Sequence, residues 1–316
     1  MRRLSLVILA STLPVFASPW GFFAHKTINE LAVYCLPPEM HSFYRANIST
    51  LIRLSVNPDM RRYVSESEAP KHYLDADHYE DCYPLDTIIR NYKQATEAYS
   101  LDTMKKYGMV PWNLQFVVYR LTESFMNNDL ENVIKISADL GHYAGDLNVP
   151  LHATHNYNGQ LTGQHGIHGL WESRLPELFF ETYRLNLARA HYISNINHAI
   201  WDSFEESFRL KDSVLQLELK TRDKIGISSM YAIENRGNQT VRSYSVSFCD
   251  AYQKQLNRMV ERRLVASIEL TSSLWYTAWV NAGQPILPDS LVEIGHHKTI
   301  ADSVTPGKIK GRFESH

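Results

Sequence analysis

Five of the fourteen histidines of the chain lie in one stretch, HYAGDLNVPLHATHNYNGQLTGQHGIHGLWE, which runs from position 142 to position 172. His142 and Asp146 are four residues apart, as are His168 and Glu172, so each pair falls on one face of a helix. His152 lies between the pairs. Zinc prefers imidazole nitrogen and carboxylate oxygen, and three or four such ligands make a site. One such pair is more often a surface hydrogen bond, but two pairs with a histidine between them predict a metal centre.

The N-terminal half supplies further residues of the same types. WGFFAH contains Trp20 and His25, and NPDMRRYVSESEAPKHYLDADHY contains Asp59, Arg62, His72, Asp75, Asp77 and His78. With them, the inventory of ligands is sufficient for three ions. The spacing of His155 and His165 does not match that of a ligand, so we interpret both as loop residues or as neighbours of the true ligands, and we read Asp77 and His78 in the same way.

Apolar residues at helical spacing dominate the rest of the chain. They predict helices over 24–36, 111–127, 129–147, 208–226 and 248–283, and strict apolar/polar alternation is rare. The glycine-rich segment 156–169 is expected to be a loop between helices. Trp112, Trp275 and Trp279 lie on apolar helical faces and are expected in the core. Without a repeat or a convincing linker, the pattern indicates one all-α domain.

The composition is that of a globular protein, with 44% hydrophobic and 21% charged residues among 316. The formal net charge of −2 argues against binding nucleic acid through a broad basic surface, whereas phosphate binding through metal ions stays open. Residues 1–17 are interpreted as a signal peptide of an exported protein, periplasmic or secreted; the alternative is a retained membrane anchor. The expected domain then spans 20–285, followed by a polar C-terminal tail over 286–316.

The sequence contains three cysteines, and an odd number in an exported protein allows one disulfide and one free thiol. Cys35 lies at helical apolar spacing in INELAVYCL, so we predict that it is a buried thiol. Cys82 and Cys249 are the expected disulfide pair.

The motifs, taken together, resemble those of the fungal and plant zinc-dependent single-strand nucleases. These enzymes share an all-helical fold and a trinuclear zinc site with the bacterial zinc-dependent phospholipases C. The resemblance covers most of the chain, and its motifs occur in the same order and at nearly the same spacing. The matching pieces are Trp20-Gly21 with His25, Asp59-Met-Arg-Arg62, His72-Tyr-Leu-Asp75, HYAGDLNVPLH from His142, and HGLWE from His168.

The resemblance implies a role for each matched residue. Asp59, His72 and His142 would bind one zinc ion, and Asp146 would bridge it to a second ion held by His25 and by the amino nitrogen and carbonyl oxygen of Trp20. His152, His168 and Glu172 would bind the third. A zinc-activated hydroxide would attack the phosphate, Arg62 would neutralise the developing charge, Asp75 would orient the attacking water, and Tyr73 would stack a base.

Two features leave the substrate open. Glu172 stands where the nucleases have aspartate, and glutamate is the choice of the phospholipases C, whereas the spacing from Trp20 to His25, the Asp-x-x-Arg motif and Trp171 are nuclease-like. The leading hypothesis is therefore a monomeric phosphodiesterase acting on single-stranded nucleic acid or nucleotides. The alternatives are a phospholipase C acting on phospholipid head groups and a non-catalytic zinc-binding helical protein.

The implied role of Trp20 requires a free α-amine at that residue. Cleavage after Ala17 would leave Ser18 and Pro19 in front of it, so we expect a second trimming step that removes this dipeptide.

Overall fold

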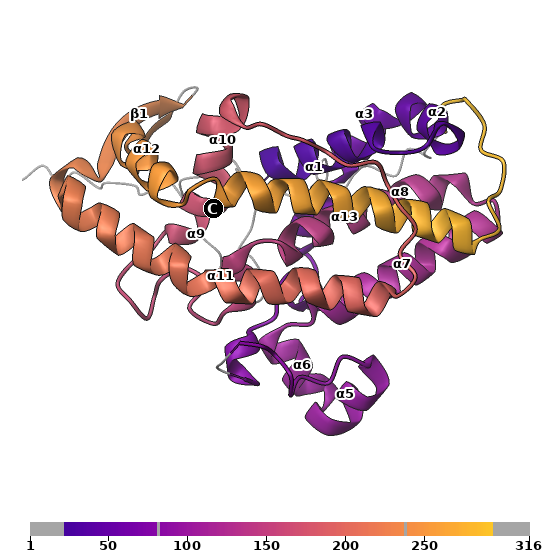
Figure 1. The fold of residues 1–316 in the computed structure, drawn as a ribbon, viewed down its shortest axis with the longest axis horizontal. Coiled ribbons are helices and arrows are strands. Elements are labelled where there is room, and N and C mark those ends of the chain that lie inside the picture. Colours follow the sequence, from indigo (N-terminus) through magenta and orange to yellow (C-terminus); the bar gives the residue numbers. More distant parts are fainter. Residues whose placement is uncertain (1–21, 81–82, 237–238, 293–316) are drawn as a thin grey trace, which may run out of the picture.

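The computed structural model describes residues 22–80, 83–236 and 239–292, and this part of the chain is mostly helical. Two long helices, α11 (Ile196–Ile225) and α13 (Met259–Asn281), run along the long axis of the molecule, as Figure 1 shows. Within the described ranges, the single sheet is the antiparallel hairpin of β1 (Tyr231–Arg236) and β2 (Gln239–Tyr244). None of the helices in these ranges combines the length and the apolar character needed to cross a bilayer.

The main core forms where α13 packs against α1 (Phe22–Tyr34), α7 (Val110–Met126) and α8 (Leu130–Leu147). Trp275 of α13 stacks on Tyr44 with ring centroids 4.9 Å apart, and its indole nitrogen donates a hydrogen bond to the Ser137 carbonyl at 3.1 Å. The indole has a polar end, so this bond makes its burial favourable. The core therefore joins α13 to the helix that carries the first predicted ligand pair.

The other α-helices of the described residues are shorter. They are α2 (Pro38–Ala46), α3 (Ile48–Leu54), α4 (Asn57–Arg61), α5 (Tyr92–Tyr99), α6 (Leu101–Tyr107), α9 (Ile167–Gly169), α10 (Leu175–Phe179) and α12 (Val246–Gln255). Short 3-10 turns lie at η1 (Ala69–Lys71), η2 (Ala76–His78), η3 (Pro150–Ala153), η5 (Phe180–Thr182) and η6 (Ile227–Ser229), and η4 (Leu170–Arg174) is a π turn. Helices α5 and α6 extend away from the long helices in Figure 1.

The predicted helices are largely confirmed, with two differences. Helix α11 begins at Ile196, where the Asn195 side chain accepts a hydrogen bond from the His198 amide at 3.0 Å and caps the helix, well before the predicted start at 208. The helix predicted over 248–283 is divided into α12 and α13, because Asn257 and Arg258 adopt left-handed φ angles of 47° and 60°. The three tryptophans expected in the core are buried.

The cysteines give a mixed outcome. Cys35 is a buried thiol, as predicted. Cys249 is also a free thiol in the structure, so the expected disulfide is not formed; Cys82 itself lies outside the described residues. Cys249 packs in the smaller hydrophobic cluster with Tyr244, Phe248 and Tyr252, and it is a core residue for that reason.

The two ends of the chain are described only in part. The predicted signal peptide, the trimming site and Trp20 lie outside the described residues. The start of the predicted polar tail is attached to the domain, because the Val292 amide donates to the Asn47 side chain at 2.8 Å and the same side chain donates to the Ser290 carbonyl at 3.1 Å.

Candidate metal centre

The structure brings eight of the nine predicted metal ligands together; the ninth, Trp20, lies outside the described residues. Seven of the side chains come from six separate elements and the eighth, His72, from the segment after η1, and all but Asp59 are buried. The set consists of His25 on α1, Asp59 on α4, His72 after η1, His142 and Asp146 on α8, His152 on η3, His168 on α9 and Glu172 on η4.

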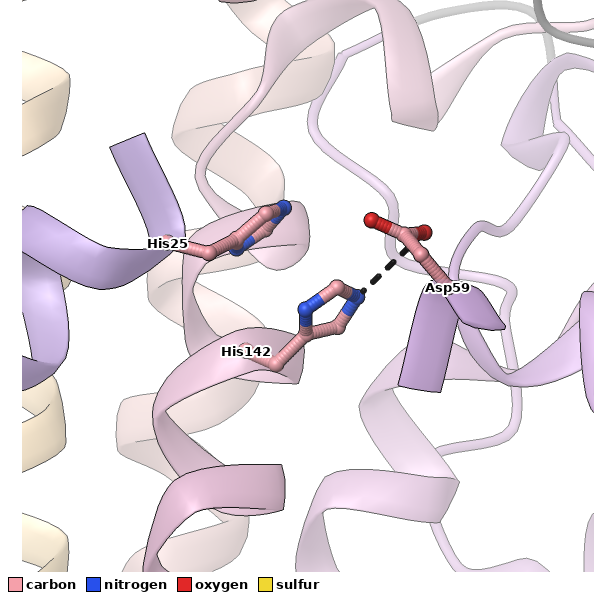
Figure 2. Close-up of side chains that lie close together, drawn as sticks. All are labelled: His25, Asp59 and His142. Atoms are coloured by element: carbon pink, nitrogen blue, oxygen red, sulfur yellow. Dashed lines mark ion pairs between the residues drawn. The ribbon is translucent and has the colours of Figure 1, made fainter. Parts of the chain in front are cut away.

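Two glycines of α8 allow α1 to approach closely enough to deliver His25. A methyl group on Gly145 would lie 3.0 Å from His25 Nδ1, and one on Gly141 would lie 2.6 Å from the Asn29 side-chain nitrogen. The His25 ring therefore stacks on the His142 ring with centroids 3.8 Å apart, as Figure 2 shows with Asp59 beside them. The side-chain amide of Asn29 donates a hydrogen bond to the backbone carbonyl of His25 at 3.0 Å and fixes this turn of α1.

The first group of ligands surrounds the Asp146 carboxylate. Its Oδ2 atom lies 2.9 Å from His72 Nδ1 and 3.3 Å from His142 Nε2. The two ring nitrogens lie 3.2 Å apart. Asp59 Oδ1 approaches from the other side, 3.6 Å from His142 Nε2 and 3.7 Å from His72 Nδ1. These are the four residues predicted to share one ion.

A second group surrounds Glu172. Its Oε2 atom lies 2.8 Å from His168 Nε2 and 3.4 Å from His152 Nε2, as expected for the third predicted ion. His25 Nε2 lies 3.4 Å from Asp146 Oδ1 and 3.5 Å from Glu172 Oε1. His25 thus stands between the two carboxylates, and it also forms a compact group with Asp59 and His142.

Two of the histidine rings form hydrogen bonds, on the side away from the carboxylates, that orient them as metal ligands. The Nδ1 atoms of His142 and His152 lie 2.8 Å and 2.6 Å from the backbone carbonyls of Ser55 and His72, so each Nδ1 must carry a proton and donate. In the neutral ring, Nε2 then presents a lone pair toward the carboxylates. Two acceptors that face each other at this distance require a cation between them. The donor set suits a divalent metal such as zinc.

The electrostatics of these side chains support the same view. Burial alone would lower the pKa of His142. The nearby carboxylates of Asp146 and Asp59 have the larger effect and raise it to about 9. Burial raises the pKa of Glu172, yet hydrogen bonds from His152 and the neighbouring histidines hold it well below its ordinary value. The carboxylates therefore stay charged and retain a positive partner, which a proton supplies when a metal does not.

Glu172 lies on the π turn η4, which directly follows α9. Single π turns inside helices are rare and occur often at functional sites. The predicted i, i+4 pairing of His168 and Glu172 is confirmed in space.

The two predicted catalytic residues and the predicted stacking residue are all buried. The guanidinium of Arg62 lies 3.7 Å from Asp59 Oδ1, next to the first ligand group. Asp75 opens η2, with its amide donating to the Tyr107 carbonyl at 2.7 Å. Tyr73 is only 4% exposed and packs against Gly108, so this placement argues against stacking a base on its ring.

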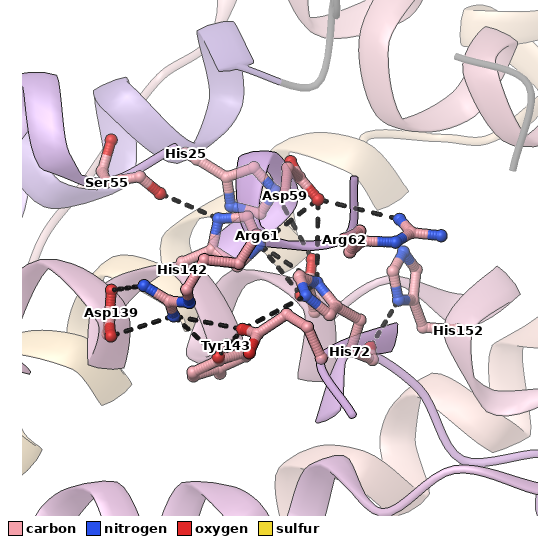
Figure 3. A network of polar contacts seen from close by, with 12 residues as sticks. His25, Ser55, Asp59, Arg61, Arg62, His72, Asp139, His142, Tyr143 and His152 are labelled. Carbon is pink, nitrogen blue, oxygen red and sulfur yellow. Dashed lines mark hydrogen bonds and ion pairs between the residues drawn. The ribbon is translucent and has the colours of Figure 1, made fainter. Parts of the chain in front are cut away.

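A second polar network lies behind the first ligand group, and the sequence analysis did not identify it. Arg61 donates to both oxygens of Asp139, at 3.1 and 3.0 Å (Figure 3). It also donates to the Glu68 carboxylate at 3.1 Å. The Tyr143 hydroxyl also bonds to Glu68. Glu68 Oε1 lies 3.8 Å from His72 Nε2, the ring nitrogen that faces away from Asp146. Glu68 and His72 are four residues apart, which is the one sequence signal for this contact.

The histidines interpreted as bystanders remain outside the ligand groups. His155 and His165 are exposed. Asp77 has a structural role, since it accepts hydrogen bonds from the Thr154 hydroxyl and the His155 amide and so anchors the segment that follows His152.

Comparison with known proteins adds no family to this geometry: no protein-family model matches the chain, and no curated protein matches it.

Proposed function

We propose that the protein is a zinc-dependent phosphodiesterase that hydrolyses P–O bonds at a centre of three zinc ions. The proposal includes the helical fold and trinuclear cleft shared by the single-strand nucleases and the zinc-dependent phospholipases C. The observation that carries it is the convergence of eight ligands, from six elements and the segment after η1, into adjacent groups that share carboxylates. Zinc in such groups would lower the pKa of a bound water and neutralise charge on a phosphate ester.

The chain's own residues would complete the reaction. Arg62 would hold its planar cation beside the first ligand group, where it neutralises charge that builds on the phosphate oxygens in the transition state. Asp75 would accept a hydrogen bond from the attacking water and orient it. Both side chains are buried, so their electrostatic effect is weakly screened by solvent.

The proposed substrate is single-stranded nucleic acid or a nucleotide, and the alternative is a phospholipid head group. Net charge provides no broad basic field, so affinity for the polyanion would come from the metal ions. Glu172 is the residue that favours the phospholipase alternative. The amino terminus of Trp20 as an additional ligand, export from the cell and a monomeric state belong to the same proposal.

The test uses zinc-loaded mature protein against single-stranded DNA, RNA and phosphatidylcholine, each with and without a chelator. We expect nucleotide release that stops on chelation. His142→Ala should lose at least a hundredfold in turnover, and His155→Ala, an exposed histidine of the same stretch, serves as the matched control and should retain it. Diacylglycerol release without nucleotide release would reverse the order of the two substrates. Full activity of His142→Ala would refute the metal assignment.

A further inference from the structure

The carboxylate of Glu172 presents its two oxygens to different histidines. Oε2 faces His168 at 2.8 Å and His152 at 3.4 Å, whereas Oε1 faces His25 at 3.5 Å. Asp146 is arranged in the same way, with Oδ2 toward His72 and Oδ1 toward His25 at 3.4 Å. His25 Nε2 therefore lies between two carboxylates, each of which uses its other oxygen in a neighbouring group.

We propose that Glu172 is a bridging ligand that joins the His25 ion to the ion of His152 and His168, as Asp146 joins the His25 ion to that of His72 and His142. The inference rests on the proposed three-zinc centre and changes the place of one ligand in it. The His25 group then shares a carboxylate with each of its neighbours and forms the middle of the centre. Its ligands within the described part of the chain are His25, Asp146 and Glu172.

The length of the side chain at position 172 follows from this role. An aspartate would place its oxygens about 1.5 Å closer to the backbone, the length of one carbon–carbon bond. It could then not reach His25 on α1 and the two histidines of η3 and α9 together. Glutamate at this position is accordingly a requirement of the bridge.

The experiment counts zinc bound to the full-length mature protein after dialysis at a fixed, buffered zinc concentration. The variants are Glu172→Asp, His25→Ala and the double substitution, with Glu181→Asp as the control because it removes one methylene from an exposed glutamate. We expect three ions in the wild type and the control, two in His25→Ala, and two or fewer in Glu172→Asp. In the Glu172→Asp background, His25→Ala should remove no further zinc, because both changes act on the same ion.

Loss of one additional ion in the double variant would overturn the bridge, since Glu172 would then serve only His152 and His168. Three ions at wild-type affinity in Glu172→Asp would overturn it as well. The isosteric Glu172→Gln is judged by the same criterion if the shorter side chain prevents folding. A wild-type protein that binds fewer than three ions refutes the proposed three-zinc centre, and hence the proposed function, independently of any variant.

Discussion

The close contact between α1 and α8 makes a quantitative prediction for Gly141→Ala. The added methyl group would lie 2.6 Å from Asn29 Nδ2 and 2.7 Å from Cγ, well inside van der Waals contact. Asn29 is fully buried, and its amide donates to the His25 carbonyl at 3.0 Å. The asparagine can therefore make room only by giving up this bond or by pushing α1 away from α8.

Opposing terms decide the sign of the effect. Alanine is favoured over glycine in a helix interior by about 1 kcal/mol. Overpacking a buried contact costs about 1–3 kcal/mol, and loss of the Asn29–His25 hydrogen bond costs about 1 kcal/mol more. We therefore expect a net destabilisation of about 1–3 kcal/mol, which corresponds to a fall in Tm of about 2–5 °C for a chain of this size.

Thermal unfolding at a fixed free zinc concentration measures the effect in Gly141→Ala, Asn29→Ala and the double variant. Removing the Asn29 side chain opens the space, so Gly141→Ala should cost less in the Asn29→Ala background and recover part of the helical preference for alanine. A rise in Tm for Gly141→Ala alone would show that the two helices separate freely, and the steric reasoning for the delivery of His25 would fail.

Two further predictions concern Glu68 and Cys249. Burial raises the pKa of Glu68, but Arg61, His72 and Lys71 lower it to about 2, so its charge stabilises the fold fully above about pH 4.5 and ceases to do so as the pH falls toward 2. Glu68→Gln should therefore lose up to about 3 kcal/mol of unfolding free energy at neutral pH and almost none at pH 2. It should also weaken zinc binding about 10–100-fold, because Glu68 lies beside the ligand His72. The same dependence of unfolding free energy on pH in the wild type and in Glu68→Gln would contradict this reasoning. Burial raises the pKa of the Cys249 thiol to about 11, so we expect alkylation only after unfolding; a disulfide-linked Cys249 peptide in an unreduced digest would contradict the free thiol.

Local sequence pattern accounts for the helices and for about half of the ligands, whereas His25, Asp59 and His72 were assigned through the family resemblance. The pairs His142/Asp146 and His168/Glu172 could be recognised because one helical turn places residues four apart on the same face. The contacts that escaped prediction join distant positions. Arg61 reaches Asp139 across 78 residues, and only packing of α4 against α8 decides that meeting. The burial of Tyr73 depends likewise on the approach of Gly108, which no local pattern indicates.

The limits of some helices and strands also depend on contacts that the sequence pattern does not reveal. The hairpin of β1 and β2 is short, and its alternating pattern is weak beside the long helices, so the sequence did not predict it. The division of α12 from α13 depends on two residues with left-handed backbone angles, neither of which is glycine. Asparagine tolerates this conformation, but arginine has no intrinsic preference for it, so the break is set by tertiary packing.

The arrangement of charge distinguishes this centre from an ordinary buried ion-pair cluster. A structural cluster gains most when every nitrogen donates to a carboxylate, yet His142 and His152 direct one N–H each to a backbone carbonyl and leave only Nε2 for the interior. Burial outweighs the nearby carboxylates at His72 and lowers its pKa, so this ring is neutral at pH 7 and brings no charge. The carboxylates of Asp59, Asp146 and Glu172 thus outnumber the fixed cation of Arg62, and the centre is balanced only when protons or metal ions enter it. Metal ions would therefore compete with protons for the same nitrogens, as is expected of a ligand set and not of a salt bridge.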